Sequence, residues 1–79
     1  MQIVSINKGF IERVKMLSKK AGIPMSKLIE DCGFSKSFAH DIEGKNKTPS
    51  IGVLYVVANY FNVSTDYLLD RTNNPDVNR

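Results

Sequence analysis

The close spacing of helix-breaking residues is the feature that most constrains how this chain can fold. Glycine, proline or asparagine interrupts the sequence after each short apolar stretch, at Gly22, Pro24, Gly33, Gly44, Pro49 and Asn62. Glycine and asparagine tolerate the left-handed backbone that ends a helix, whereas proline suits a first helical turn. The 79-residue sequence therefore predicts five short helices joined by tight turns, and all-α is the expected fold class.

Apolar side chains recur at helical spacing within each segment and mark the face that each helix would bury. The clearest pattern lies in the fourth segment, between Pro49 and Asn62. Ser35 and Ser64 are placed to cap the third and fifth helices. The side chains expected to face inward are Phe10, Val14 and Leu17 in helix 8–20, Leu28 and Ile29 in the second helix, Ala39 and Ile42, flanked by Phe38, in helix 36–43, and Ile51, Leu54, Tyr55, Ala58 and Phe61 in the fourth; the fifth carries Tyr67, Leu68 and Leu69.

The composition fits one small folded domain. Apolar residues make up 42% of the chain, enough for a core, but a chain this short has little room for a catalytic cleft or a ligand-sensing domain. Its single cysteine cannot form an internal disulfide, and no apolar run approaches the length of a membrane span, so we expect a cytoplasmic protein without a small-molecule effector. We divide it into an N-terminal arm over 1–8, a domain over 9–70 and a C-terminal tail over 71–79.

Positive charge is concentrated in the N-terminal two-thirds of the sequence. The net charge is +3; residues 1–49 hold nine Lys/Arg against five Asp/Glu, and residues 50–79 hold two against three. Most basic faces are simply solvated, but this asymmetry points to a polyanionic partner such as nucleic acid.

Three catalytic residue types, Ser37, His40 and Asp41, fall in the third predicted helix. A catalytic triad needs the histidine between the serine and the carboxylate. Consecutive helix residues diverge by about 100°, so His40 and Asp41 do not face each other, and Asp41 would instead neighbour Ser37 at i+4. One histidine and Cys32 are also too few ligands for zinc. We expect neither an enzyme nor a metal or cofactor site.

The same helix presents a polar face suited to another chemistry. Ser37, His40, Asp41 and Gly44 fall at i, i+3, i+4 and i+7, with Lys36 on the exposed flank. A tight glycine turn joins this helix to the preceding short one. Two helices joined in this way form the unit that places its second member in the major groove of DNA.

Short motifs follow one another in a specific order along the chain. They are Leu28, Gly33-Phe34-Ser35, Ile42-Glu43-Gly44-Lys45, Thr48-Pro49-Ser50, Leu54, Ala58, Phe61-Asn62-Val63-Ser64 and Tyr67-Leu68-Leu69. In this order and spacing, over roughly residues 9–70, the chain resembles the Cro/phage-repressor-like (Xre) family of helix-turn-helix DNA-binding proteins.

The resemblance implies a compact five-helix lambda-repressor-like helix-turn-helix domain. It implies a cytoplasmic transcriptional regulator, a repressor, that binds double-stranded DNA as a homodimer on a pseudo-palindromic operator. The residues implied to approach base edges are Lys36, Ser37, His40 and Asp41. The residues implied to contact phosphates are Ser26, Lys27, Lys45, Asn46, Lys47 and Thr48.

Three positions depart from the family pattern, and the first is Pro24, which stands where the family frequently has a Thr or Ser cap. Met25 stands where the family often has a polar residue that braces the DNA contact, and Asp41 would repel phosphates unless Lys45, at i+4, neutralised it. Met25 and Asp41 favour an alternative function, a protein-interaction module built on the same scaffold. A second alternative is an antitoxin that keeps DNA binding and represses its own operon. Tyr55, Phe61 and Tyr67 are expected to be core or interface aromatics. Dimer contacts are expected from the fifth helix, Tyr67, Leu68 and Leu69, or from the N-terminal arm pairing as a strand.

Overall fold

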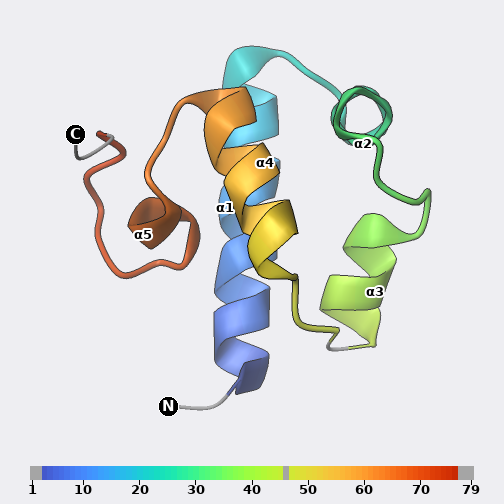
Figure 1. The fold of residues 1–79 in the computed structure, drawn as a ribbon, viewed down its shortest axis with the longest axis horizontal. Coiled ribbons are helices and arrows are strands. Elements are labelled where there is room, and N and C mark those ends of the chain that lie inside the picture. The colour runs from blue at the N-terminus through green and yellow to red at the C-terminus, as the bar shows by residue number, and fades with distance from the viewer. Residues whose placement is uncertain (1–2, 46, 77–79) are drawn as a thin grey trace.

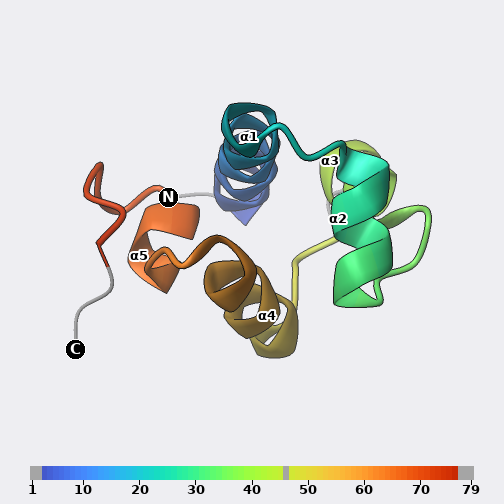
Figure 2. The ribbon, with the colours of Figure 1, turned by 90° about the horizontal axis from the view of Figure 1, so that it is seen from above.

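Five helices form the computed structural model, which describes residues 3–45 and 47–76, and no strand occurs among those residues. The helices are α1 (Ile3–Ala21), α2 (Met25–Cys32), α3 (Phe38–Gly44), α4 (Ile51–Phe61) and α5 (Thr65–Leu68). Two perpendicular views show α1 and α4 in the middle, α2 and α3 together on one side, and α5 on the other (Figures 1 and 2). The all-α, five-helix prediction is confirmed.

The core lies where these helices meet, and Phe38 is central to it. Its ring stacks on that of Phe34, with centroids 4.5 Å apart, and meets the ring of Phe10 edge-on at 6.5 Å. Aromatic pairs prefer these two arrangements, which here join α3 to α1. The buried apolar residues are Phe10, Ile11, Val14, Leu28, Phe38, Ile42, Val57, Ala58, Val63, Tyr67 and Leu68.

Helix ends follow the predicted stop and cap residues closely. Gly33 closes α2 with φ of 73°, and Asn62 closes α4 with φ of 54°, both in the left-handed region. Ser50 Oγ accepts from the backbone N–H of Val53, and Ser64 caps α5 in the same way. Each cap satisfies an amide that has no partner within its helix.

The start of α1 differs from the prediction. The helix begins at Ile3 instead of about residue 8, so residues 3–8 form its first turns. The prediction that the N-terminal arm pairs as a strand is therefore wrong for these residues. Asn7 lies on the same stripe as Phe10 and Val14 and is fully buried, so packing extends to this part of the helix. The division into arm, domain and tail itself stays a prediction.

The start of α3 also differs from the prediction, by two residues. Ser35 is not its N-cap, because the N–H of Phe38 donates to the Ser35 carbonyl in a turn that precedes the helix. That turn directs Phe38 into the core, where it is 7% exposed, whereas Ala39 is only half-buried. Lys36 and Ser37 therefore stand at the entry to the helix, outside its regular part.

The buried face of α4 was predicted only in part. Leu54, Ala58 and Phe61 face the core as expected, but Ile51 is 85% and Tyr55 66% exposed. The sequence of α4 is apolar on almost every side, so the spacing of its apolar residues allows more than one inward face. Packing against α2 and α5 selects the face that contains Val57.

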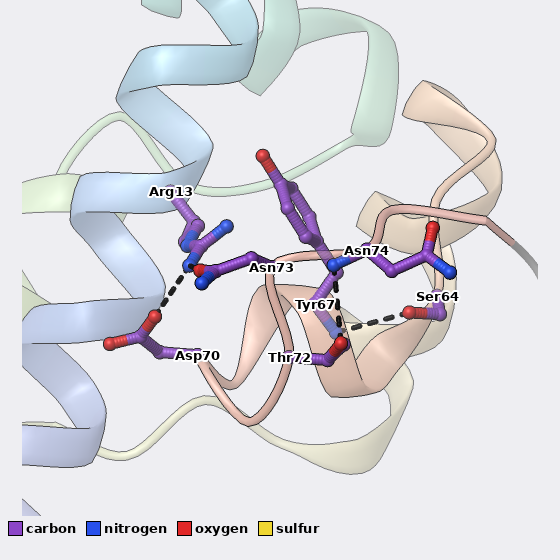
Figure 3. Close-up of polar contacts among 7 residues, drawn as sticks. All are labelled: Arg13, Ser64, Tyr67, Asp70, Thr72, Asn73 and Asn74. Atoms are coloured by element: carbon purple, nitrogen blue, oxygen red, sulfur yellow. Dashed lines mark hydrogen bonds and ion pairs between the residues drawn. The ribbon is translucent and has the colours of Figure 1, made fainter.

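The residues after α5 are held against α1. Arg13 donates from Nη2 to Asp70 Oδ1 at 2.6 Å and to Asn73 Oδ1 at 2.9 Å, as Figure 3 shows. Its guanidinium lies 4.2 Å from the centroid of the Tyr67 ring. The bond to Asp70 is the main reason why the pKa of Arg13 is raised. The N–H of Ser64 also donates to the Pro75 carbonyl at 3.0 Å.

This packing corrects the expected dimer contact on α5. Tyr67 and Leu68 are only 7% and 0% exposed, because α5 turns both side chains toward α1 and α4. Neither side chain is available to a second copy. Leu69 is half-buried.

Candidate nucleic-acid interface

Two short helices and a tight turn carry most of the residues proposed from the sequence. In Figure 1, α2 is seen end-on whereas the axis of α3 lies close to the plane of the picture, so the axes of the two helices are steeply inclined to each other. The turn between them is built by Gly33 and Phe34, whose N–H groups donate to the carbonyls of Glu30 and Ile29. Stacking of Phe34 on Phe38 then fixes the direction in which α3 leaves the turn.

Asp41 is the centre of a polar network on α3. Ser37 Oγ donates to Asp41 Oδ2 at 2.9 Å, which confirms the expected i+4 pairing. Lys45 Nζ lies 3.8 Å from Asp41 Oδ1, so the expected neutralising cation is in place. Ser35 Oγ lies 3.2 Å from Ser37 Oγ. The serine thus bonds directly to the carboxylate, whereas a triad needs the histidine between them.

His40 and Lys36 flank this network and are both exposed. The His40 ring lies over Gly44, where an added Cβ would come within 3.1 Å of the ring. Lys36 forms no ion pair with any residue in the described ranges. Lys36 in the entry turn and His40 on α3 are therefore both accessible to solvent.

The loop between α3 and α4 is anchored from both sides. The Lys47 N–H donates to the Asp41 carbonyl at 2.9 Å, and Asn7 Nδ2 donates to Thr48 Oγ1 at 3.3 Å. Asn46, also expected at phosphate, lies outside the described residues. Sequence analysis missed Asn7, although a polar residue on the apolar stripe of Phe10 and Val14 was a usable signal.

A depression of about 330 Å³ lies between α3, this loop and the start of α4. It brings together Asp41, Lys47 and Thr48, three of the residues proposed from the sequence. The residues that line it are Phe34, Ser35, Phe38, Asp41, Ile42, Lys47, Thr48, Pro49, Ser50 and Val53. The lining thus combines apolar side chains with hydroxyl-bearing and charged residues.

The phosphate-contacting residues expected on α2 lie in its first turn. Ser26 and Lys27 are exposed, and Lys27 Nζ lies 3.0 Å from Asp31 Oδ1. That ion pair raises the pKa of Lys27. Met25 packs against the core, and Ser18 Oγ donates to its sulfur at 3.4 Å. The side chain at this departure from the family pattern is therefore used in packing.

Two contacts that sequence analysis missed hold α2 and α3 in place. Tyr60 Oη of α4 donates to Asp31 Oδ2 at 2.6 Å, which lowers the pKa of Asp31 and raises that of Tyr60 to about 12. Lys15 of α1 pairs with Glu43 of α3 and lowers the pKa of that carboxyl. Both contacts join helices far apart in sequence, so spacing alone gave no sign of them.

Neither a cluster of metal ligands nor a membrane-spanning helix is found among the described residues. In residues 3–45 and 47–76, no three His, Cys, Asp or Glu side chains are grouped as metal ligands. Cys32 packs against the core as expected, and burial raises the pKa of its thiol. None of the described helices has the length and apolar character to cross a bilayer.

A tight glycine turn joins α2 to α3, and Phe38 anchors α3 while its outer side is polar. This arrangement is consistent with a small helix-turn-helix domain. The chain is 33% identical over 67 residues to the uncharacterized HTH-type transcriptional regulator YobD of Bacillus subtilis (strain 168). This match covers 85% of the chain and 60% of YobD, so the chain spans about three-fifths of the length of that curated relative. No family model and no solved structure matches the chain.

Proposed function

We propose that this protein is a sequence-specific DNA-binding transcriptional regulator of the Xre type, a repressor, that places α3 in the major groove. The observation that carries the proposal is the polar outer side of α3, held at a fixed angle by Phe34 and Phe38. The similarity to YobD, named as an HTH-type transcriptional regulator, supports it. An α-helix fits the major groove, where each base pair presents a distinct pattern of donors and acceptors.

The proposed roles divide the polar residues into two groups. Base edges are contacted from α3 and its entry turn by Lys36, Ser37, His40 and Asp41. Phosphates are contacted by Ser26, Lys27, Lys45, Asn46, Lys47 and Thr48. Lys27 and Lys45 each have a carboxylate partner in the free protein, so DNA must compete with Asp31 and Asp41 for these cations.

We further propose that two copies bind a pseudo-palindromic operator. The exposed apolar side chains Ile51 and Tyr55 of α4 support a contact between chains, whereas α5 turns its own apolar residues inward. Sedimentation of the protein alone and with operator duplex tests this proposal. Monomer alone and a single copy per operator would contradict it.

The decisive experiment for DNA binding is selection of duplexes from a randomised pool, at about 150 mM salt to suppress non-specific phosphate binding. We expect a two-fold motif with half-sites about 10 base pairs apart. Lys36→Ala should change the motif, whereas Lys47→Ala should weaken binding without changing it. Lys20→Ala is the matched control, because Lys20 lies beside Phe61 and Pro75, on another part of the surface.

A second candidate function is a protein-interaction module or antitoxin on the same scaffold. The exposure of Ile51 and Tyr55 favours it, since large exposed apolar side chains grouped on one helix can mark an interaction surface. Absence of any enriched motif in the selection would contradict the DNA-binding proposal and leave this candidate in its place.

A further inference from the structure

The direction of the hydrogen bonds around Asp41 determines what α3 can offer to a base. An ionised carboxylate only accepts hydrogen bonds, and the Lys45 ammonium lies 3.8 Å from that of Asp41. Ser37 must therefore be the donor in its 2.9 Å bond to Asp41. Its single hydroxyl hydrogen is then committed, so Ser35 is the donor across the 3.2 Å that separates the two serine oxygens.

Only acceptors remain at the centre of the polar face once this chain of bonds is formed. Ser37 keeps one lone pair, and the Asp41 side chain, 18% exposed, keeps its other acceptor positions. Donors lie around this pair, where Lys36, His40 and Lys45 are exposed. The centre and the edges of α3 therefore differ in hydrogen-bonding character.

In the major groove, adenine N6 and cytosine N4 are the base groups that donate, whereas guanine O6 and thymine O4 accept. We propose that Ser37 and Asp41 form an acceptor-only pair that selects bases with an amino group in the major groove, adenine or cytosine, on one fixed strand at the centre of each half-site. Guanine or thymine there would set a carbonyl oxygen against the Asp41 carboxylate, an unfavourable contact that excludes them. This inference rests on the proposed DNA-binding function.

Asp41→Asn tests the pair, because asparagine has nearly the same shape and can still accept from Ser37 but adds two N–H donors. In the selection described above, the parent protein should enrich adenine or cytosine at the central positions. Asp41→Asn should reduce the discrimination against guanine and thymine there by about tenfold or more. Ser37→Ala, which keeps the carboxylate, should relax a single position. Circular dichroism establishes that each variant is folded.

A complementary experiment changes the DNA and leaves the protein intact. Purine in place of adenine, or pyrimidin-2-one in place of cytosine, removes only the exocyclic amino group. At a central position this change should weaken binding of the parent by about tenfold and binding of Asp41→Asn much less. The same change outside the half-sites is the control, and it should have no effect.

The outcomes separate this inference from the proposed function. If removal of the amino group at the centre, on either strand, leaves binding by the parent unchanged, or if Asp41→Asn leaves the preferences unchanged, then Asp41 has only a structural role and the inference fails while DNA binding stands. If the parent enriches no motif at all, the proposed function and the inference fail together.

Discussion

At the residue scale, individual hydrogen bonds determine which polar groups of the proposed interface are available. Asp41 holds the Ser37 hydroxyl, and Asp31 holds both Lys27 and the hydroxyl of Tyr60. The i+4 pairs within α2 and α3 can be foreseen from helical spacing. The bond from Tyr60 cannot, because it depends on how α4 packs against α2.

The contact between Tyr60 and Asp31 should make stability depend on pH at both ends of the range. The lowered pKa of Asp31 contributes stability that is present above about pH 4 and lost as the pH falls through the lowered value. The pKa of Tyr60, raised to about 12, contributes stability that is present below about pH 10 and lost as the pH rises toward 12. Urea unfolding of the parent and Tyr60→Phe should differ most near neutral pH and less at either extreme.

Absorbance titration of the tyrosines gives an independent measurement of the same contact. One tyrosine should ionise near pH 12, and Tyr60→Phe should remove that step. Tyr55→Phe, at an exposed position of the same helix, should leave it in place. Loss of the step in Tyr55→Phe instead would contradict the assignment.

At the element scale, the ends of helices are set by local chemistry and their faces by packing. Gly33 and Asn62 close α2 and α4 because both residue types tolerate positive φ. Ser50 and Ser64 cap the helices that follow them. By contrast, the inward face of α4 was predicted only in part and the start of α3 two residues too early, since packing partners of both helices are distant in sequence.

Replacing two glycines by alanine should have opposite effects on stability. Gly33 has φ of 73° and open space around it, so Gly33→Ala introduces only backbone strain, about 1–2 kcal/mol. Gly52 lies in the first turn of α4, where an added Cβ would meet only Ser50 Oγ, at an ordinary 3.7 Å. Gly52→Ala should stabilise by about 0.5 kcal/mol. Chemical denaturation measures both, and equal effects of the same sign would contradict the helix-closing role of Gly33.

At the scale of the whole molecule, contacts between the ends of the chain complete the domain. Arg13 of α1 donates hydrogen bonds to Asp70 and Asn73, which follow it by 57 and 60 residues, and its guanidinium lies over the Tyr67 ring (Figure 3). These contacts hold the residues that follow α5 against α1, where the sequence predicted only a peripheral tail.

Arg13→Lys should weaken this contact while keeping the positive charge. Lysine lacks the planar fork that reaches Asp70 and Asn73 together and stacks on Tyr67. We expect the free energy of unfolding to fall by about 1 kcal/mol. Hydrogen exchange at the amide of Ser64, which bonds to the Pro75 carbonyl, should become faster. Arg71→Lys is the matched control, because both side chains of the Arg71–Asp66 ion pair are exposed and about zero change in the free energy of unfolding is expected. An equal loss of stability in this control would contradict the special role of Arg13.

The sequence by itself determined the all-α class, the number of helices and most of their ends, because glycine, asparagine, serine and proline act on the backbone within a few residues. It also determined the i+4 network of Ser37, Asp41 and Lys45, which needs only helical periodicity. Tertiary structure decided the exposed side of α4, the burial of Phe38 and Asn7, and the contacts made by Tyr60 and Arg13. Each of these depends on which surfaces meet when distant segments exclude water together, and local sequence does not encode that choice.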